Sequence, residues 1–291
     1  MCFVLSLIAR PGELIPFAIE AARDEANGGT VTTLASGEVV DIACAADPDM
    51  EAIRTALGGA PVDAIAAPAA NRRKRLLIAD MDSTIVTGET LDELADFAGL
   101  KERIAAITRR SMNGEIDFAT ALRERVAMLK GLGLDALERT WERVRLTDGA
   151  RELVQTMRAH GAVCALVSGG FTFFTGRVAS LAGFDLHRAN VLLDDGVALL
   201  GRVAEPILDR DAKLTTLRAL AAEYRIPLSE TLAVGDGAND LAMLGAAGLG
   251  VAFHAKPIVA TETKARVEHA GLRALLFAQG YRAEEIVADR A

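Results

Sequence analysis

The pattern of apolar positions divides the chain into two parts with different orders of elements. In the first seventy residues, short apolar runs with strand-like composition alternate with runs that have helical spacing. The strand-like runs occupy 2–8, 30–34, 38–43 and 62–66, and the helical runs occupy 14–25 and 49–57. A small α+β unit with the order βαββαβ is therefore predicted here.

The rest of the chain changes to a rhythm in which helices and buried strands alternate. Strands are expected at 76–79, 162–167, 231–234 and 249–252, and helices at 150–160, 174–181, 212–224 and 240–246, with a hairpin turning at 194–196. Such alternation predicts a parallel, doubly wound α/β sheet that binds ligands at the carboxyl ends of its strands. The helical pattern over 91–144 is too long for a crossover, which indicates an inserted cap at about 88–147.

Charge supports the same division into domains. Residues 1–70 have a net charge of -7 and residues 71–291 a net charge of -1. We therefore expect a domain at 1–70, a basic linker at 71–75 and a larger domain at 76–291. The basic run Arg72-Arg73-Lys74-Arg75 is interpreted as a solvated linker edge. No large basic face is available for nucleic acid.

Membrane and secreted classes are disfavoured by the apolar runs and the cysteines. The apolar run at 3–9 is too short to span a bilayer, and it lacks the flanks of a signal peptide. The three cysteines are widely spaced and have no zinc-ligand pattern. These features favour a reduced, cytoplasmic compartment.

Polar residues that carry chemistry follow three of the predicted strands. Asp80-Met81-Asp82-Ser83-Thr84 follows the first strand of the larger domain, and Ser168-Gly169-Gly170 follows the second. The segment 235–240 follows the third, and Lys213 lies near the start of the helix before it. Parallel strands would bring these groups to one edge of the sheet.

Three carboxylates at that edge predict a bound cation. Asp80 and Asp82 share a face of extended chain, and Asp236 adds a third negative charge. Oxygen ligands of this kind suit Mg²⁺. With Lys213 and the hydroxyl of Ser168 nearby, the site suits a phosphoryl group, which one carboxylate can attack while another transfers the proton.

This ordered set of motifs resembles the haloacid dehalogenase-like phosphatases, and in detail the phosphoserine phosphatases among them, across roughly 75–280. The resemblance implies a Rossmann-like core, a helical cap and Mg²⁺ as cofactor. It implies that Asp80 is the nucleophile and a metal ligand, and that Asp82 is the proton donor and acceptor, with its backbone carbonyl on the metal. The other implied residues are Asp236 and the supporting Asp240 at the metal, and Ser168, Gly169, Gly170, Lys213 and Asn239 at the phosphate.

The resemblance also implies a substrate, O-phospho-L-serine, which would be cleaved to L-serine and phosphate in the last step of serine biosynthesis. Glu89 matches the cap carboxylate that faces the substrate ammonium, and Arg125 matches the guanidinium that holds its carboxylate. Met112 and Phe118 match apolar cap residues that close over the site. The four histidines lie outside these motifs and are interpreted as structural or surface residues.

Alternatives remain open at this point. The chain could act on another small phosphomonoester, or pass the phosphoryl group to an alcohol instead of water. A receiver-like module, phosphorylated without turnover, is a further hypothesis, and Asp82 argues against it. The element order of residues 1–70 resembles the ferredoxin-like fold of ACT-type domains, which leaves open an amino-acid sensor or a homodimer formed through this domain.

Overall fold

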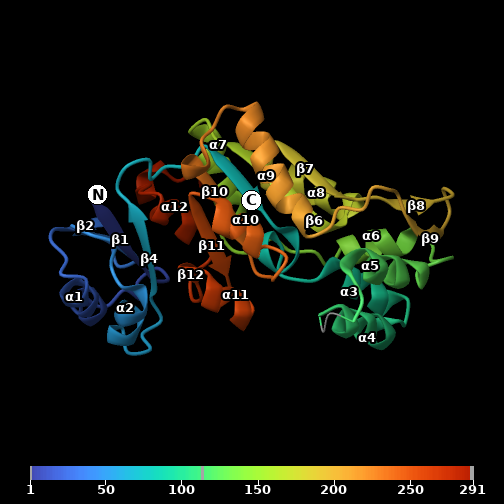
Figure 1. Cartoon of the computed structure of the whole chain (residues 1–291), viewed down its shortest axis with the longest axis horizontal. Helices are drawn as coiled ribbons and strands as arrows, with labels where there is room; N and C mark the ends of the chain where they lie inside the picture. Colours follow the sequence, from blue (N-terminus) through green and yellow to red (C-terminus); the bar gives the residue numbers. More distant parts are fainter. Residues whose placement is uncertain (1, 113–114, 289–291) are drawn as a thin grey trace.

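The computed structural model describes residues 2–112 and 115–288. Figure 1 shows three parts in a row, with the small N-terminal unit at one end, a parallel sheet in the middle and the cap helices at the other end. In the described ranges, no helix has the length and apolar character needed to cross a membrane.

The N-terminal unit has the predicted order βαββαβ. Its antiparallel sheet has the order β2-β3-β1-β4. The strands are β1 (Phe3–Ile8), β2 (Val31–Ala35), β3 (Val39–Cys44) and β4 (Asp63–Pro68), and the helices are α1 (Pro16–Glu25) and α2 (Met50–Ala56). Pro16 suits the first turn of α1, where no backbone donor is needed. Asp49 caps α2 by accepting the N–H groups of Glu51 and Ala52.

The central sheet confirms the predicted parallel α/β core. It has six parallel strands in the order β12-β11-β10-β5-β6-β7. The strands are β5 (Leu76–Ala79), β6 (Val163–Phe171), β7 (Leu186–Asn190), β10 (Thr231–Gly235), β11 (Leu249–Phe253) and β12 (Ala265–Val267). The helices are α7 (Ala150–Ala159), α8 (Thr172–Ala182), α9 (Asp211–Glu223), α10 (Leu241–Ala246), α11 (Pro257–Glu262) and α12 (Ala274–Ala278), with 3₁₀ turns at Leu228–Glu230 and Ala283–Glu285.

The block between β5 and α7 consists of helices, as the pattern predicts. After a short helical turn at Met81–Ile85 come α3 (Thr90–Phe97), α4 (Lys101–Met112), α5 (Phe118–Ala127) and α6 (Asp135–Trp141). The hairpin of β8 (Leu192–Asp194) and β9 (Leu199–Val203) packs on α5. This group of elements lies together beyond the end of the sheet (Figure 1).

The register of the central strands determines where the site forms. β5 lies between β6 and β10, and Ala79 is paired with Leu166 on one side and Val234 on the other. The residues that follow these positions therefore emerge at the same edge of the sheet. β6 runs on to Phe171 with an irregular register, so the segment 168–170 lies within that strand rather than after it.

The interpretation of the basic run as a solvated edge holds for Arg73 and Arg75, which are exposed, and is wrong for Arg72 and Lys74. Arg72 forms an ion pair with Asp41 of β3, and both side chains are 12% exposed. Lys74 is buried and donates its ammonium protons to the carbonyls of Asn71 and Ser229. These cations are buried because the N-terminal sheet packs on the core: Ile65 of β4 and Phe277 of α12 belong to one hydrophobic cluster.

Candidate active site

The site begins where β5 ends. Asp80 is buried, and its carboxylate accepts the N–H of Met81 at 2.8 Å. The chain then turns sharply: Asp82 is extended, while Ser83 has a φ of +53°, in the left-handed region. This turn separates the two carboxylates and leads the chain into the cap.

Lys213 lies between two of the acidic side chains. Its Nζ is 2.8 Å from Oδ1 of Asp80 and 2.5 Å from Oδ1 of Asp240, and its side chain is 3% exposed. Asp80, Asp236 and Asp240 each offer a carboxylate oxygen, and these oxygens all lie within 4.8 Å of one another. Gly235 makes room for this cluster, because a Cβ at that position would overlap the Asp240 side chain.

The cluster carries more negative charge than Lys213 neutralises. Burial, together with the charge of Asp80, raises the pKa of Asp240 to about 7. Burial also raises the pKa of Asp236, against the attraction of Lys256, whose Nζ lies 3.5 Å from its carboxylate. For Lys213, burial lowers the pKa, but the charges of Asp240 and Asp80 outweigh it and raise the pKa overall. Oxygen donors with excess negative charge fit a hard divalent cation.

Asp82 is not one of the three clustered carboxylates, but it lies near enough for the charge of Asp80 to contribute to its raised pKa. Burial, followed by the charge of Glu89, raises the pKa of Asp82 to about 8. One carboxylate oxygen accepts the N–H of Thr90, at the start of α3, at 2.9 Å. A Cβ placed on Gly170 would lie 3.1 Å from the other oxygen and also 3.1 Å from Oγ of Ser168. Asp82 and Ser168 therefore converge on the same glycine.

The segment 168–170 is held by a residue that the sequence analysis missed. Ser168 is buried, and its hydroxyl accepts the N–H of Gly170 at 2.9 Å. Asn190, at the end of β7, donates to the carbonyl of Gly169 at 2.9 Å and accepts the N–H of Leu208 at 2.8 Å. A buried asparagine at a strand end is a signal that could have identified it.

The cap places three of the predicted residues near the core. Glu89 accepts a hydrogen bond from the Ser83 hydroxyl at 2.8 Å. Arg125 on α5 is half-buried, which lowers its pKa, while the charges of Asp92 and Glu89 oppose this change. A Cβ on Gly169 would lie 3.1 Å from the Phe118 ring, so this ring covers the glycine.

For two other predicted residues, Asn239 and Met112, the described contacts do not test the predicted role. The side-chain oxygen of Asn239 folds against Gly237, within its own loop. The Met112 side chain lies outside the described residues. Thr90 and Lys256, by contrast, contact predicted site residues although the sequence analysis did not single them out.

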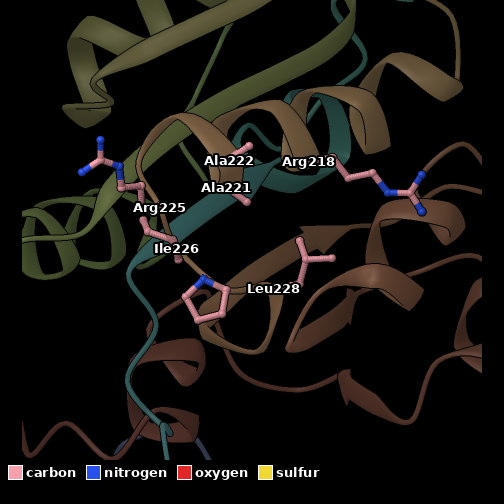
Figure 2. Close-up of a pocket in the computed structure, with 7 residues that line it drawn as sticks. Arg218, Ala221, Ala222, Arg225, Ile226 and Leu228 are labelled. Atoms are coloured by element: carbon pink, nitrogen blue, oxygen red, sulfur yellow. The ribbon is translucent and has the colours of Figure 1, made fainter.

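A surface depression of about 490 Å³ lies beside the C-terminal end of α9 (Figure 2), whereas Lys213 belongs to the first turn of this helix. It is lined by residues between 218 and 228, with an apolar floor that includes Ile226 and Leu228, and the side chains of Arg218 and Arg225 point outward at its margins. No carboxylate or hydroxyl lines it. The chemistry described above is therefore not located there.

Comparisons with known proteins agree with this geometry. A curated phosphoserine phosphatase from Streptomyces coelicolor is 41% identical over 247 residues, which is 82% of this chain and 60% of that protein. One from Streptococcus thermophilus is 47% identical over 187 residues, 64% of this chain and 86% of that protein. A crystal structure of a probable phosphoserine phosphatase from Vibrio cholerae superposes with a TM-score of 0.79 at 31% identity, covering 96% of this chain and 86% of that one.

The matches define the family of the chain. The chain spans 53 to 60% of the length of three of the curated relatives that it matches. The model of the haloacid dehalogenase-like hydrolases matches residues 77–245, which include the strand ends and the carboxylates described above. The chain belongs to the haloacid dehalogenase-like hydrolase family.

Proposed function

We propose that this chain hydrolyses O-phospho-L-serine to L-serine and phosphate, with catalysis in residues 76–291 under a cap at about 88–147. The observation that carries the proposal is the convergence of Asp80, Asp82, Ser168 and Lys213 at one sheet edge, beneath a cap that contributes a carboxylate and a guanidinium. The curated relatives from Streptomyces coelicolor and Streptococcus thermophilus are phosphoserine phosphatases, which supports the substrate.

The carboxylate cluster suits Mg²⁺ as the cofactor. Asp80 and Asp236 would hold the ion together with the backbone carbonyl of Asp82, while Asp240 supports the cluster through Lys213. When bound, Mg²⁺ would draw charge from the phosphoryl oxygens and keep the carboxylates ionised. The donor set fits the ion, because every side chain in the cluster offers oxygen and one ammonium leaves negative charge in excess.

In the first step, a carboxylate oxygen of Asp80 attacks the phosphorus of the substrate. The bond from phosphorus to the serine oxygen breaks, and Asp82 donates a proton to that oxygen, which leaves as the serine hydroxyl. With a pKa of about 8, Asp82 carries this proton at neutral pH. The ammonium of Lys213, the hydroxyl of Ser168 and the backbone N–H of Gly169 stabilise the negative charge on the phosphoryl oxygens, while the N–H of Gly170 orients the Ser168 hydroxyl.

In the second step, water attacks the phosphorus and the bond to Asp80 breaks. Asp82, now ionised, takes the proton from the water, so both residues return to their first state. The cap excludes bulk water until the leaving serine has been protonated. Phe118 contributes to this closure through its contact with Gly169.

Specificity for an amino-acid ester would come from the cap. Arg125 offers a planar pair of donors to the substrate carboxylate, and Glu89 offers an acceptor to its ammonium. Both residues belong to the cap rather than the core. Closure would therefore be favoured by the substrate that satisfies both groups, which links recognition to catalysis.

The first experiment measures phosphate release from L-phosphoserine, with and without Mg²⁺, beside sugar phosphates, nucleotides and phosphothreonine. We expect Mg²⁺-dependent release that favours phosphoserine. Asp80→Asn should abolish turnover while leaving the circular dichroism spectrum unchanged. Substantial turnover by a folded Asp80→Asn protein would remove Asp80 as the nucleophile, and release from other esters but not phosphoserine would remove the substrate.

A second experiment tests the cap. Arg125→Ala should lower kcat/KM for phosphoserine by about a hundredfold, the loss expected for a charge-assisted pair, and should change phosphoethanolamine, which lacks the carboxylate, far less. Arg123→Ala is the matched control, because Arg123 lies on the same helix but is 54% exposed and pairs with Glu205. Equal losses on both esters would refute the role of Arg125.

A further inference from the structure

A second cavity lies at the boundary between the N-terminal unit and the core. It has a volume of about 250 Å³ and is lined by residues 48–51 and Arg54 on one side and by residues 261–264 and Arg266 on the other. α2 contributes the first side, and the end of α11 with β12 contributes the second. Figure 1 shows α2 and α11 on the two sides of this boundary, away from the cap. We call this cavity the boundary cleft.

Two arginines in the boundary cleft share a single acceptor atom. Nη1 of Arg54 and Nη2 of Arg266 each lie 2.6 Å from Oε1 of Glu51. The arginine side chains are 19% and 17% exposed, whereas that of Glu51 is 70% exposed. Burial and the positive charge of Arg266 both lower the pKa of Arg54. Arg54 also donates to the carbonyl of Lys264 and Arg266 to that of Thr263, at 2.5 and 3.3 Å, but the charge that the two cations share is the exposed carboxylate of Glu51.

The other charged groups of the boundary cleft do not replace Glu51. Asp49 is already engaged, because its carboxylate accepts two backbone N–H groups at the start of α2. Glu268 attracts Arg54 less strongly than Glu51 does. Lys264 adds a third cation, 85% exposed, which pairs with Asp47 at 3.3 Å. Glu262 also lines the boundary cleft, so that its lining holds three acidic and three basic side chains, but in the part of the chain that the structure describes Glu51 is the one carboxylate paired with either guanidinium group.

We propose that the boundary cleft binds the phosphate group of a small molecule, either free phosphate or a phosphomonoester, in place of the Glu51 carboxylate. A tetrahedral dianion offers several oxygens, so that each guanidinium can donate to a separate anionic oxygen instead of sharing Oε1 of Glu51. Glu51 reaches the same position from the surface and can swing into solvent when the ligand enters. This site is separate from the carboxylate cluster and does not depend on the proposed hydrolysis.

The ligand would connect the two parts of the molecule. Arg54 belongs to the N-terminal unit and Arg266 to β12 of the core, so one anion would contact both. A ligand that binds the folded chain and not the unfolded chain raises its stability in proportion to the logarithm of ligand concentration. Phosphate should therefore raise the thermal unfolding midpoint as well as bind.

The test is isothermal titration of the full chain with inorganic phosphate, and separately with glycerol 2-phosphate, in buffer containing EDTA. Without a divalent cation, the carboxylates around Asp80 repel phosphate, so binding reports the boundary cleft. We expect one site per chain, with affinity lowered about tenfold or more by Arg266→Gln or Arg54→Gln. Glu51→Gln should tighten binding about threefold, because it removes a competing charge.

The arginine variants should weaken phosphate binding and Glu51→Gln should tighten it. Damage to the fold would weaken binding in all three variants, so the opposite effects distinguish ligand binding from such damage. Arg10→Gln is the matched control: Arg10 donates to the carbonyl of His269 across the same boundary but does not line the cleft, and its variant should bind phosphate normally. Absence of saturable phosphate binding, unchanged affinity in Arg266→Gln, or unchanged or weaker affinity in Glu51→Gln would each overturn the proposal. Phosphoserine turnover in Mg²⁺, measured in parallel, tests the proposed function independently.

Discussion

Replacing Arg72 by methionine tests how the two parts of the chain are joined. The guanidinium donates to both oxygens of Asp41, at 2.5 and 2.8 Å, and to the hydroxyl of Ser6 at 2.7 Å. It also donates to the carbonyls of Phe277 and Ala278 on α12, at 3.0 and 2.9 Å. Methionine keeps much of the side-chain volume and removes all of these bonds. The perturbation therefore isolates the polar junction between β3 and α12.

The expected loss is large because both partners are buried. Arg72 and Asp41 are each 12% exposed, so the variant leaves a buried carboxylate without its cation. Breaking a buried pair in this way costs about 3–5 kcal/mol, out of a total stability of roughly 5–15 kcal/mol for a typical protein. Arg75→Met is the matched control from the same basic run. Arg75 is 56% exposed and pairs with Glu230, so its loss should be about 0–1 kcal/mol.

The assay is urea unfolding at neutral pH, followed by circular dichroism, with the free energy extrapolated from a fit that includes the m-value. In the double variant Arg72→Met with Asp41→Asn, the second substitution removes the unpaired negative charge of Asp41. The double variant should therefore lose less free energy of unfolding than the sum of the losses of the two single variants. A loss for Arg72→Met no greater than that for Arg75→Met would refute the reasoning. It would mean that the junction behaves as an exposed ion pair.

Two further predictions concern the cap and a buried acid. Gly169→Ala places a Cβ 3.1 Å from the Phe118 ring, so kcat/KM should fall about tenfold because closure of the cap is hindered. Gly245→Ala is the control: the space around Gly245 is open, so this variant should not change kcat/KM. Equal kcat/KM values for the two variants in steady-state assays would contradict this prediction. Burial raises the pKa of Glu38 above its ordinary 4.5, against the attraction of Arg273. The stability that this raised pKa contributes is fully present below pH 4.5 and is lost as the pH rises through the folded pKa. Glu38→Gln should therefore gain stability relative to wild type as the pH rises above 4.5, measured by urea unfolding at a series of pH values.

Local patterns were sufficient to predict most of the architecture. Strands such as β5 and β10 are short apolar runs bounded by polar residues, and α7 has a clear apolar stripe, so their types follow from periodicity. The last sheet strand, β12, and the helix α12 were not predicted. β12 has three residues, and α12 is apolar on every side because it lies between the core and the N-terminal sheet. Neither has a local period to detect.

The candidate site was predictable where strand ends define it. Asp80 and Asp236 follow neighbouring parallel strands, so topology alone places their carboxylates together. Asn190, Thr90 and Lys256 were missed because each acts through a contact that depends on tertiary folding rather than on a motif. Arg72 was misinterpreted for the same reason, since its partner Asp41 is thirty-one residues away, in β3 of the N-terminal sheet.

The balance of charge distinguishes two groups of buried ionised side chains that the sequence pattern cannot tell apart: the junction around Arg72 and the carboxylate cluster around Lys213. At the junction, Arg72 meets one carboxylate, one hydroxyl and two carbonyls, so its donors are satisfied within the chain, as a structural role requires. At the sheet edge, Lys213 contacts two carboxylates of a three-carboxylate cluster, and negative charge remains. A folded protein maintains such an imbalance at a cost in stability. The excess charge at the sheet edge is therefore the feature that marks this cluster, and not the junction, as the place where a cation and a phosphoryl group would be bound.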